Sequence, residues 1–208
     1  MRICSLKPNG FFQAGGVLAR SFRDSPLTIA VMGGSPEQRE AAIFPSLEVS
    51  LSLAFNRTTL LQVKQNDGCP KGILMGIEPG YFPLPPLGLL QYWRVIRSQG
   101  WRATKRWSQV FHTLEGSHPF LPHWYLAMLG VDLDTQRRGL GGFLLASWLD
   151  LVDQEEGEAY LETDTEEGVE FYRRRGFQVI RELNFFDTAV WCMLRPVSYT
   201  HLTLPTKA

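Results

Sequence analysis

Residues 136–142, QRRGLGG, form a basic, glycine-rich turn with the chemistry of an anion-binding site. The turn follows an apolar stretch, WYLAMLGV, and leads into LGGFLLASWLDLVD, which has the character of a helix. Glycine permits backbone conformations with positive φ and a close approach of the main chain to a ligand. The free N–H groups and the dipole at the start of a helix favour a bound phosphate. The pattern therefore predicts that this turn binds a phosphate-bearing molecule.

A second block, EFYRRRGFQV at residues 170–179, makes the first one more specific. Together the two blocks resemble motifs A and B of the GNAT superfamily of acyl-CoA N-acyltransferases. The first family signature, Q/R-x-x-G-x-G/A, is matched by residues 136–141. The second, Y-x-x-x-G-F, is matched by Tyr172, Gly176 and Phe177. The resemblance covers residues 122–194, and HWYLAMLGVDLDTQ looks like the family's fourth strand and the turn after it.

The resemblance implies an α/β (α+β) GNAT fold, with a mixed, mostly antiparallel central sheet that splays between strands 4 and 5 and is flanked by helices. It implies acetyl-CoA as the cofactor, held by backbone groups of the turn and by the exposed edge of strand 4. A backbone N–H of Met128 or Leu129 would polarise the thioester carbonyl. The cofactor-binding residues that it implies are Leu129, Val131, Gln136, Arg137, Arg138, Gly139, Leu140, Gly141 and Gly142.

Three residues are candidates for proton transfer. Tyr172 matches the position from which the family's tyrosine protonates the departing CoA thiolate, and the alternative is a core tyrosine. Glu162, in the strand-like YLETD, and His123, at the start of the cofactor strand, are alternative bases for the amine. Either one also fits a structural role, Glu162 in an ion pair and His123 as a surface or capping residue.

The remaining elements follow from local patterns. TTLLQVKQ and KGILMGIEPG flank an Asn-Asp-Gly turn and predict a hairpin. A helix begins at Ser35-Pro36-Glu37, and Pro45 is expected to break or kink it. Residues 88–116 are expected to be helical with a break near Gly100, within an insertion at 81–120 that shapes the acceptor pocket. Its candidate buried positions are Leu89, Leu90, Trp93, Ile96, Trp107, Val110, Phe111 and Leu114.

Composition sets the class of the protein. The 208 residues predict a single domain over 1–196, and residues 197–208 continue no pattern and read as a non-native tail. A net charge of zero gives no support for nucleic acid or for an anionic membrane as a partner. The three cysteines and the four histidines show no metal-ligand spacing, so we expect no metal and reduced thiols. The expected location is the cytoplasm, and the expected state is a monomer or a homodimer.

The function that these features favour is transfer of an acetyl group from acetyl-CoA to a primary amine of a small molecule. The lead-in and the YLET strand look most like the branch that includes puromycin-type antibiotic acetyltransferases. Three alternatives stay open: a protein N-terminal or lysine acetyltransferase, a non-catalytic acyl-CoA-binding module, and a dinucleotide-binding Rossmann domain. The last is disfavoured because the glycine turn comes late in the chain, after a hairpin.

Overall fold

The computed structural model describes residues 2–56, 58–64 and 68–197. The strands are β1 (Arg2–Ser5), β2 (Thr58–Lys64), β3 (Pro70–Ile77), β4 (Trp124–Val131), β5 (Ala159–Thr163), β6 (Gln178–Phe185) and β7 (Thr188–Arg195). The helices are α1 (Phe11–Phe22), α2 (Pro26–Met32), α3 (Pro36–Ala54), α4 (Leu89–Glu115), α5 (Leu140–Gln154) and α6 (Glu166–Arg173). Two short 3-10 turns are η1 (Pro8–Gly10) and η2 (Leu133–Thr135).

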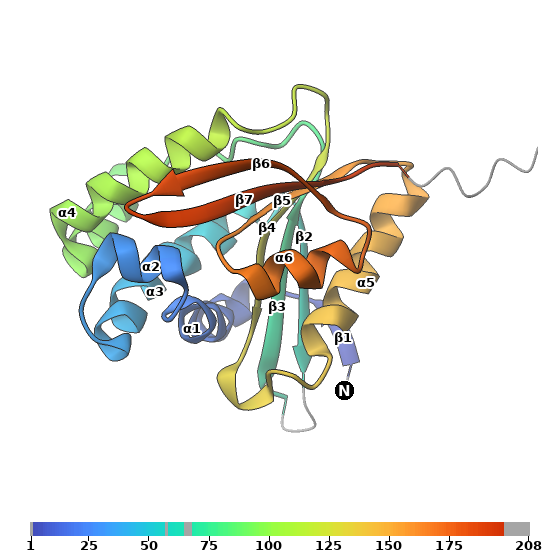
Figure 1. Cartoon of the computed structure of the whole chain (residues 1–208). Helices are drawn as coiled ribbons and strands as arrows, with labels where there is room; N and C mark the ends of the chain where they lie inside the picture. Colours follow the sequence, from blue (N-terminus) through green and yellow to red (C-terminus); the bar gives the residue numbers. More distant parts are fainter. Residues whose placement is uncertain (1, 57, 65–67, 198–208) are drawn as a thin grey trace, which may run out of the picture.

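The strands form one sheet in the order β1-β2-β3-β4-β5-β7-β6 (Figure 1). Only the β4–β5 pair in it is parallel, and every other neighbouring pair is antiparallel. Parallel strands need a crossover connection, and α5 supplies it between β4 and β5. This topology confirms the predicted mixed, mostly antiparallel sheet.

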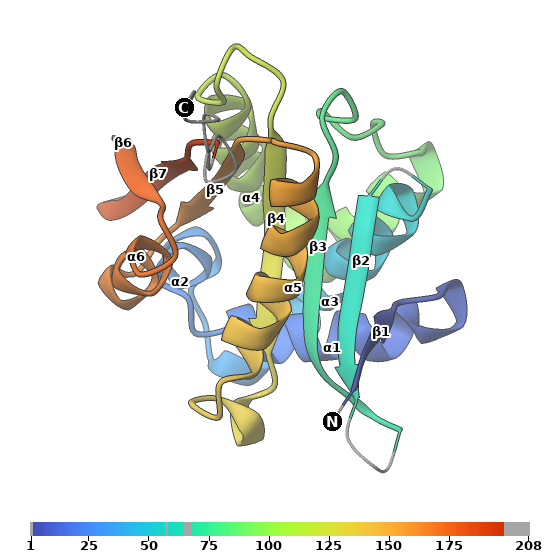
Figure 2. The same ribbon diagram turned by 90° about the vertical axis from the view of Figure 1, so that its right-hand side faces the viewer.

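Helices cover both faces of the sheet. In Figure 2, α5 lies in front of β2, β3 and β4, whereas α1 and α3 lie behind them. The α5 side holds one apolar core, to which α6 contributes Val169. On the α1 side a second core forms around Leu18 and Leu51. Since β3 is buried between the two cores, its sequence KGILMGI is an almost continuous apolar run.

The hairpin of β2 and β3 confirms the predicted one, although Asn66 and Asp67 of its turn lie outside the described residues. Ser35 begins α3 with a capping box, as the Ser-Pro-Glu signal predicts. The expectation of a break at Pro45 is wrong, because α3 continues through it to Ala54. The helix is held by its packing on α1, with Phe44 against Phe12, and this contact outweighs one lost backbone hydrogen bond.

Helix α4 is bent at Gly100, where φ is +79°, which confirms the predicted break. Four of its predicted core positions are instead exposed, namely Leu89, Leu90, Trp93 and Phe111. The bend changes the direction of the helix axis, so a single helical face cannot be extrapolated across it. Of the predicted positions, Val110 and Leu114 are buried, against α2 and the β6–β7 pair.

None of the described helices combines the length and the apolar character that crossing a membrane requires. The predicted non-native tail lies outside the described residues except for Val197.

Candidate functional site

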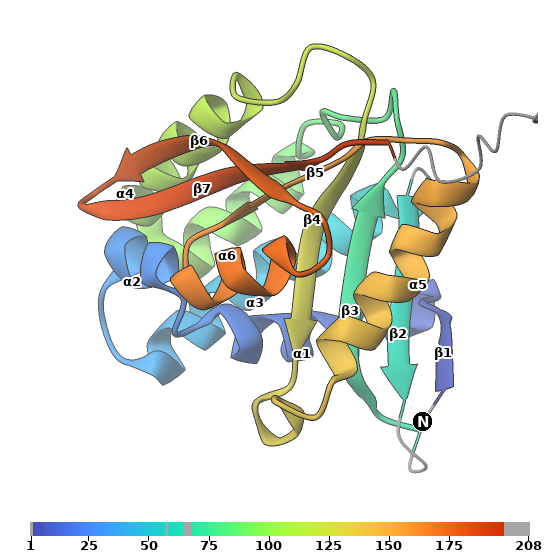
Figure 3. The same cartoon turned by 45° about the vertical axis from the view of Figure 1, so that its right-hand side comes forward.

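Strands β4 and β5 diverge at the centre of the sheet (Figure 3). They pair only at Trp124↔Ala159, Tyr125↔Tyr160 and Leu126↔Leu161. Directly after the last pair, Ala127 is an extra residue in β4, because Met75 pairs with Met128 and Gly76 with Leu126. A bulge of this kind bends its strand and increases the twist. The edge of β4 beyond Leu126 is therefore not covered by β5.

At the far end of this edge, side chains engage both backbone groups of Val131. Its N–H donates to Oγ of Ser21 in α1 at 3.3 Å, and its carbonyl accepts from Nε2 of Gln136 at 3.2 Å. Leu129, the other edge residue implied by the resemblance, lies between the bulge and this end. Both contacts of Val131 are long for hydrogen bonds, so a ligand amide can replace them at low cost.

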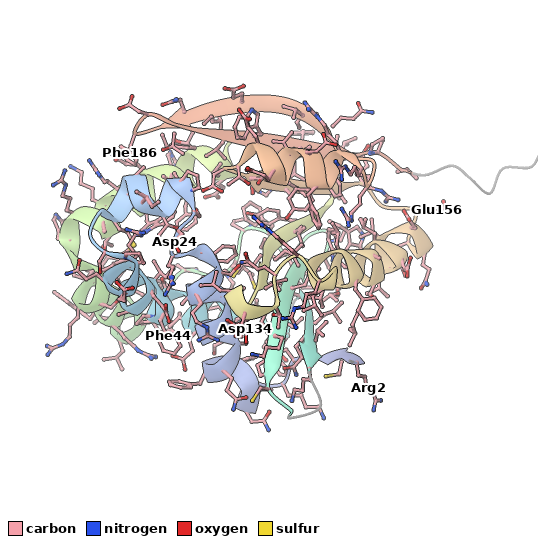
Figure 4. The ribbon with its side chains drawn as sticks, turned by 60° about the horizontal axis from the view of Figure 1, so that its bottom comes forward. Arg2, Asp24, Phe44, Asp134, Glu156 and Phe186 are labelled. Carbon is pink, nitrogen blue, oxygen red and sulfur yellow. The ribbon has the colours of Figure 1, made fainter. Side chains whose placement is uncertain are left out.

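The end of β4 is tied to α1 by Asp132. Its two carboxylate oxygens accept from Nε and Nη2 of Arg20, each at 2.9 Å, and Oδ1 also accepts from the N–H of Leu133. The Arg20 guanidinium holds the pKa of Asp132 below its usual value. Lys71 bonds Asp134 at 2.7 Å. Figure 4 views the molecule from this end and labels Asp134 in the turn that leads to α5.

The predicted anion-binding turn lies between η2 and α5. Gly139 is the N-cap of α5 with φ +81°, a left-handed conformation, and Arg137 before it also has a positive φ of +60°. No side chain caps α5 in the described structure, and the first turn holds no acidic residue. The N–H groups of Leu140, Gly141 and Gly142 are therefore the unsatisfied amides of a helix start. Leu140 itself is buried, so only its backbone can face a ligand.

Arg175, which follows α6, adds a positive charge at the same place. Its guanidinium stacks on the Phe171 ring at 3.8 Å and lies so close to α5 that a Cβ on Gly142 would meet Nη2 at 2.5 Å. Among the described residues, no carboxylate is within ion-pair distance of Arg175. A cation beside the positive end of a helix is unfavourable unless an anion binds there. A shallow hollow of about 770 Å³ adjoins Arg175 and Phe171, and Glu166, Glu167, Glu170 and Arg174 complete its lining. The anion site is therefore assigned to the helix start beside Arg175 and not to this hollow.

Replacing Arg175 by glutamine is therefore expected to weaken acetyl-CoA binding by about tenfold, or ~1.4 kcal/mol. Isothermal titration calorimetry measures this directly. Arg174→Gln is the matched control, because Arg174 is the exposed neighbour and is already paired with Glu170 at 2.9 Å. Equal affinities in the two variants would remove Arg175 from the anion site.

Tyr172 lies in α6 on the inner side of the same region. Its ring packs against Phe171 and Phe177, with centroids 5.0 Å and 5.7 Å away, and it borders the core that Leu129 and Val131 also border. Burial raises the pKa of Tyr172, and the charge of Arg175 opposes that rise. The phenol is therefore protonated at neutral pH.

A second group of polar side chains lies at the point where β5 leaves β4. Glu162 follows the last paired residue of β5, and its side chain is only 9% exposed. Its Oε1 is 3.4 Å from Nε2 of His118, a side chain that is 6% exposed. Nδ1 of His118 is 2.9 Å from Nε2 of His123, whose Nδ1 is 2.8 Å from the carbonyl oxygen of Leu121. Glu162 and His123, alternatives in the sequence, thus belong to one connected group.

Aromatic rings enclose this group. Phe82 stacks on His118 with centroids 4.0 Å apart, and the rings of Tyr125 and Tyr160 each lie 4.5 Å from it. Burial, and then the charge of Glu162, raises the pKa of both tyrosines. Burial lowers the pKa of His123. The two phenols are therefore neutral at pH 7, which leaves Glu162 and the two histidines as the groups that exchange protons.

The comparison of this architecture with known proteins settles its fold. No family model matches the sequence. The histone acetyltransferase HPA2 and related acetyltransferase of Corynebacterium glutamicum is similar to it over 96% of this chain and 98% of that one, with a TM-score of 0.71 and 17% identity. The polyamine N-acetyltransferase of Drosophila melanogaster is similar over 94% of this chain and 99% of that one, with a TM-score of 0.67 and 14% identity. The PaiA N-acetyltransferase of Thermoplasma acidophilum, in complex with coenzyme A, is similar over 94% of this chain and 98% of that one, with a TM-score of 0.56 and 12% identity. The chain has the GNAT fold.

The GNAT fold explains which predicted residues meet. Glu162 and His123 lie where β4 and β5 are still paired, and Tyr172 borders the same core as Leu129 and Val131 on the open part of β4. Two functional candidates were absent from the sequence prediction, Arg175 and His118. Arg175 is the last residue of the RRR run, and nothing in that run separates it from its exposed neighbours. His118 shows no ligand spacing, and only the folded insertion brings it to Glu162.

Asp164 and Thr165, which directly follow β5, have structural roles. Oδ2 of Asp164 accepts from the N–H of Leu27 at 2.8 Å and from Oγ of Ser25 at 2.5 Å, so it caps α2. Thr165 caps α6 by accepting from the N–H of Gly168 at 3.0 Å. These contacts commit Asp164 to the start of α2.

Proposed function

We propose that this protein transfers an acetyl group from acetyl-CoA to the primary amine of a small molecule. The observation that carries the proposal is the unpaired edge of β4, with an uncapped helix start at one end and the buried carboxylate of Glu162 at the other. The fold supports it, because the similar structures are acetyltransferases.

The described residues fit acetyl-CoA. The amides of Leu140, Gly141 and Gly142, with the charge of Arg175, would hold the diphosphate. The backbone of Leu129 and Val131 would pair with the amides of the pantetheine arm, as an added strand does. Gln136 occupies the carbonyl of Val131 until an amide of the ligand replaces it, and exposed Arg137 and Arg138 add charge around the turn. When bound, acetyl-CoA supplies an activated acyl group.

The side chains divide the proton transfers between them. Glu162 takes a proton from the ammonium group of the acceptor, so that a neutral amine attacks the thioester carbonyl. The carbon–nitrogen bond forms, the carbon–sulfur bond breaks, and Tyr172 donates its proton to the departing sulfur. A phenol is already a weaker acid than an ordinary thiol, and the raised pKa of Tyr172 widens that difference. Its contribution is therefore expected to be modest.

The surroundings of Glu162 favour a small acceptor over a protein. A protein acetyltransferase needs an open groove beside its base, whereas Glu162 is buried beside His118, Tyr125 and Tyr160, and Phe82 stacks on the far side of His118. Phe82 and His118 both belong to the insertion at 81–120, which supports its role in shaping the acceptor pocket. The branch with puromycin-type acetyltransferases agrees with such an acceptor.

A panel of amines with acetyl-CoA, followed by release of free thiol, tests this function. The panel includes aliphatic and aromatic amines, polyamines, aminonucleosides and peptides with free N-termini or lysines. We expect a higher rate of thiol release with the small amines than with the peptides. Acetyl-CoA binding without turnover of any amine would instead select the non-catalytic binding module.

Tyr172→Phe is expected to lower kcat by about 10- to 100-fold, near the low end for proton-transfer catalysis, because water replaces the phenol as the acid. Acetyl-CoA affinity stays within about twofold, since no charge is removed from the anion site. Steady-state kinetics and calorimetry measure the two quantities. Tyr92→Phe, on the exposed side of α4, is the control. A Tyr172→Phe enzyme with wild-type kcat would show that the tyrosine only packs the core.

A further inference from the structure

The segment from Pro79 to Leu114, which includes most of α4, carries a local excess of positive charge. It contains five Lys and Arg residues and no Asp or Glu, although the whole chain is neutral. Three of the five are exposed and have no carboxylate within ion-pair distance among the described residues, namely Arg97, Arg102 and Lys105. The zero net charge of the chain therefore conceals a positive surface on α4.

The other two basic residues of the segment are engaged inside the protein. Arg94 pairs with Glu48 of α3 at 2.6 Å, and Nη1 of Arg106 donates to the carbonyl oxygen of Ala30 at 2.8 Å. These contacts hold α4 against α3 and α2. They leave the charge of the three exposed residues for a partner outside the chain.

The same part of the chain exposes apolar side chains to solvent. Ten of the seventeen exposed large apolar side chains among the described residues lie between Tyr81 and Leu121. At the start of α4, Leu89, Leu90 and Trp93 are 72%, 86% and 61% exposed. Neighbouring apolar side chains that a soluble protein leaves in water mark a surface for interaction.

These apolar side chains share one face of α4 with a free charge. Leu89, Trp93 and Arg97 follow one another at intervals of four residues, and Leu90 lies beside them, so the four form one surface, the α4 patch. The opposite side of this half of the helix holds buried Val95 and packs on α3. Because α3 and α5 lie on opposite faces of the sheet (Figure 2), the patch lies away from the anion-binding turn at α5.

We propose that the α4 patch docks this protein on the surface of an anionic phospholipid bilayer. Its two leucines enter the boundary between headgroups and acyl chains, and Trp93 lies at the level of the headgroups. Arg97 binds lipid phosphate, and Arg102 and Lys105 beyond the bend of α4 add attraction to the negative surface. This inference does not depend on the proposed function.

Other partners match the α4 patch less well. A second copy of the chain, docked face to face, would bring the basic residues of the two segments together with no acid from either segment to offset them. Single-stranded nucleic acid stacks its bases on aromatic rings, whereas the most exposed residues of the patch, Leu89 and Leu90, have no ring. An acidic protein matches the charge alone and offers no apolar layer for the leucines.

Co-sedimentation of the full chain with vesicles tests the docking. Vesicles of phosphatidylcholine and phosphatidylglycerol in equal parts are expected to bind at least about tenfold more tightly than vesicles of phosphatidylcholine alone, and added salt is expected to weaken that binding.

The double variant Leu89→Glu/Leu90→Glu tests the apolar contribution. It is expected to bind the anionic vesicles at least about tenfold more weakly, because the new charges are repelled by the lipid and do not enter the bilayer. Acids in the first turn of a helix are favourable, so the melting temperature is expected to be unchanged. Ile180→Glu, an exposed position in β6, is the control and is expected to bind as the wild type does.

Two single variants test the charge. Arg97→Gln and Lys105→Gln are each expected to weaken binding to the anionic vesicles about fivefold. Lys7→Gln removes an exposed charge outside the segment and is expected to have no effect.

Fluorescence reports whether the patch enters the bilayer. Acyl chains brominated near the headgroup are expected to quench wild-type fluorescence more strongly than that of Trp93→Phe, since Trp93 lies closest to them. Equal quenching in the two proteins would place the bilayer elsewhere and overturn the docking of this patch.

The remaining outcomes separate the partners. Equal affinity for the two kinds of vesicle, or wild-type affinity in the double variant, would overturn the docking. So would tighter binding to poly-glutamate or to a single-stranded oligonucleotide than to the anionic vesicles, or a dimer in analytical ultracentrifugation that the double variant dissociates. Acetyl-CoA affinity and amine turnover in solution are expected to be unchanged in all these variants, so the docking and the proposed function can fail separately.

Discussion

Glu162→Gln is expected to lower kcat for amine acetylation by about 100- to 10,000-fold, the usual range for loss of a general base. Glutamine keeps the size of the side chain, and its amide can form a hydrogen bond with Nε2 of His118, which lies 3.4 Å from Oε1 of Glu162. The fold is therefore preserved, and the loss belongs to proton transfer. Amine turnover by thiol release and melting temperature by calorimetry measure the two effects.

The control for this substitution is Glu155→Gln, which removes an exposed acid at the end of α5, far along the chain from the histidines. Acetyl-CoA affinity is expected to be the same in both variants and in the wild type. If Glu162→Gln turned over amines at the wild-type rate, the base would have to be sought outside the group of Glu162, His118 and His123.

Gly139→Val is expected to weaken acetyl-CoA binding by at least about 100-fold, or ~2.7 kcal/mol. Open space surrounds the position of a Cβ on Gly139, so the penalty comes from φ +81°, which a β-branched residue avoids. The turn must change its conformation to relieve that strain, and the amides of Leu140, Gly141 and Gly142 then no longer converge on one point. Calorimetry with acetyl-CoA gives the affinity.

Gly80 offers a matched position for this experiment. Its φ is +84°, and a Cβ there also meets nothing within 4 Å, but it lies in the turn after β3 instead of at a helix start. Gly80→Val is expected to lower the melting temperature comparably and to leave acetyl-CoA affinity intact. An equal loss of affinity in both variants would mean that general destabilisation, and not the turn at α5, explains the result.

Local sequence signals predict the parts of the fold that local physics determines. Apolar β4, the glycine turn and α5 follow one another in the chain, and each carries its own signal. The start of α2 also has a local signal, because Ser25 caps the helix and Pro26 is its first residue. Strand β1, four residues long, carries too little pattern and forms by pairing with distant β2.

The site was predictable to a different degree at its two ends. The binding groups of the turn could be predicted from the motif, because they are backbone N–H groups. Their position depends on where the helix begins, at Leu140, and not on the identity of the side chains. The partner of Glu162 was not predictable, since His118 comes from an irregular segment after the bend in α4 and meets Glu162 only through tertiary packing. The exposure of Leu89 and Trp93 has the same origin, because the face that α4 buries before Gly100 depends on its tertiary contact with α3, where Arg94 pairs with Glu48.

Because β4 and β5 pair at only three positions, the sheet has two parts, β1–β4 and β5–β7, that share few backbone hydrogen bonds. The β1–β4 part is covered by α1 and α5, whereas the β5–β7 part pairs with β4 at only three positions and otherwise contacts it through side chains of the core under α5. A fluctuation that rotates one part against the other has a lower free-energy cost than the unfolding of either part. A ligand bound between the separated ends of β4 and β5 would restrict that rotation. Amide hydrogen exchange would then slow even in β6, which lies at the edge of the β5–β7 part.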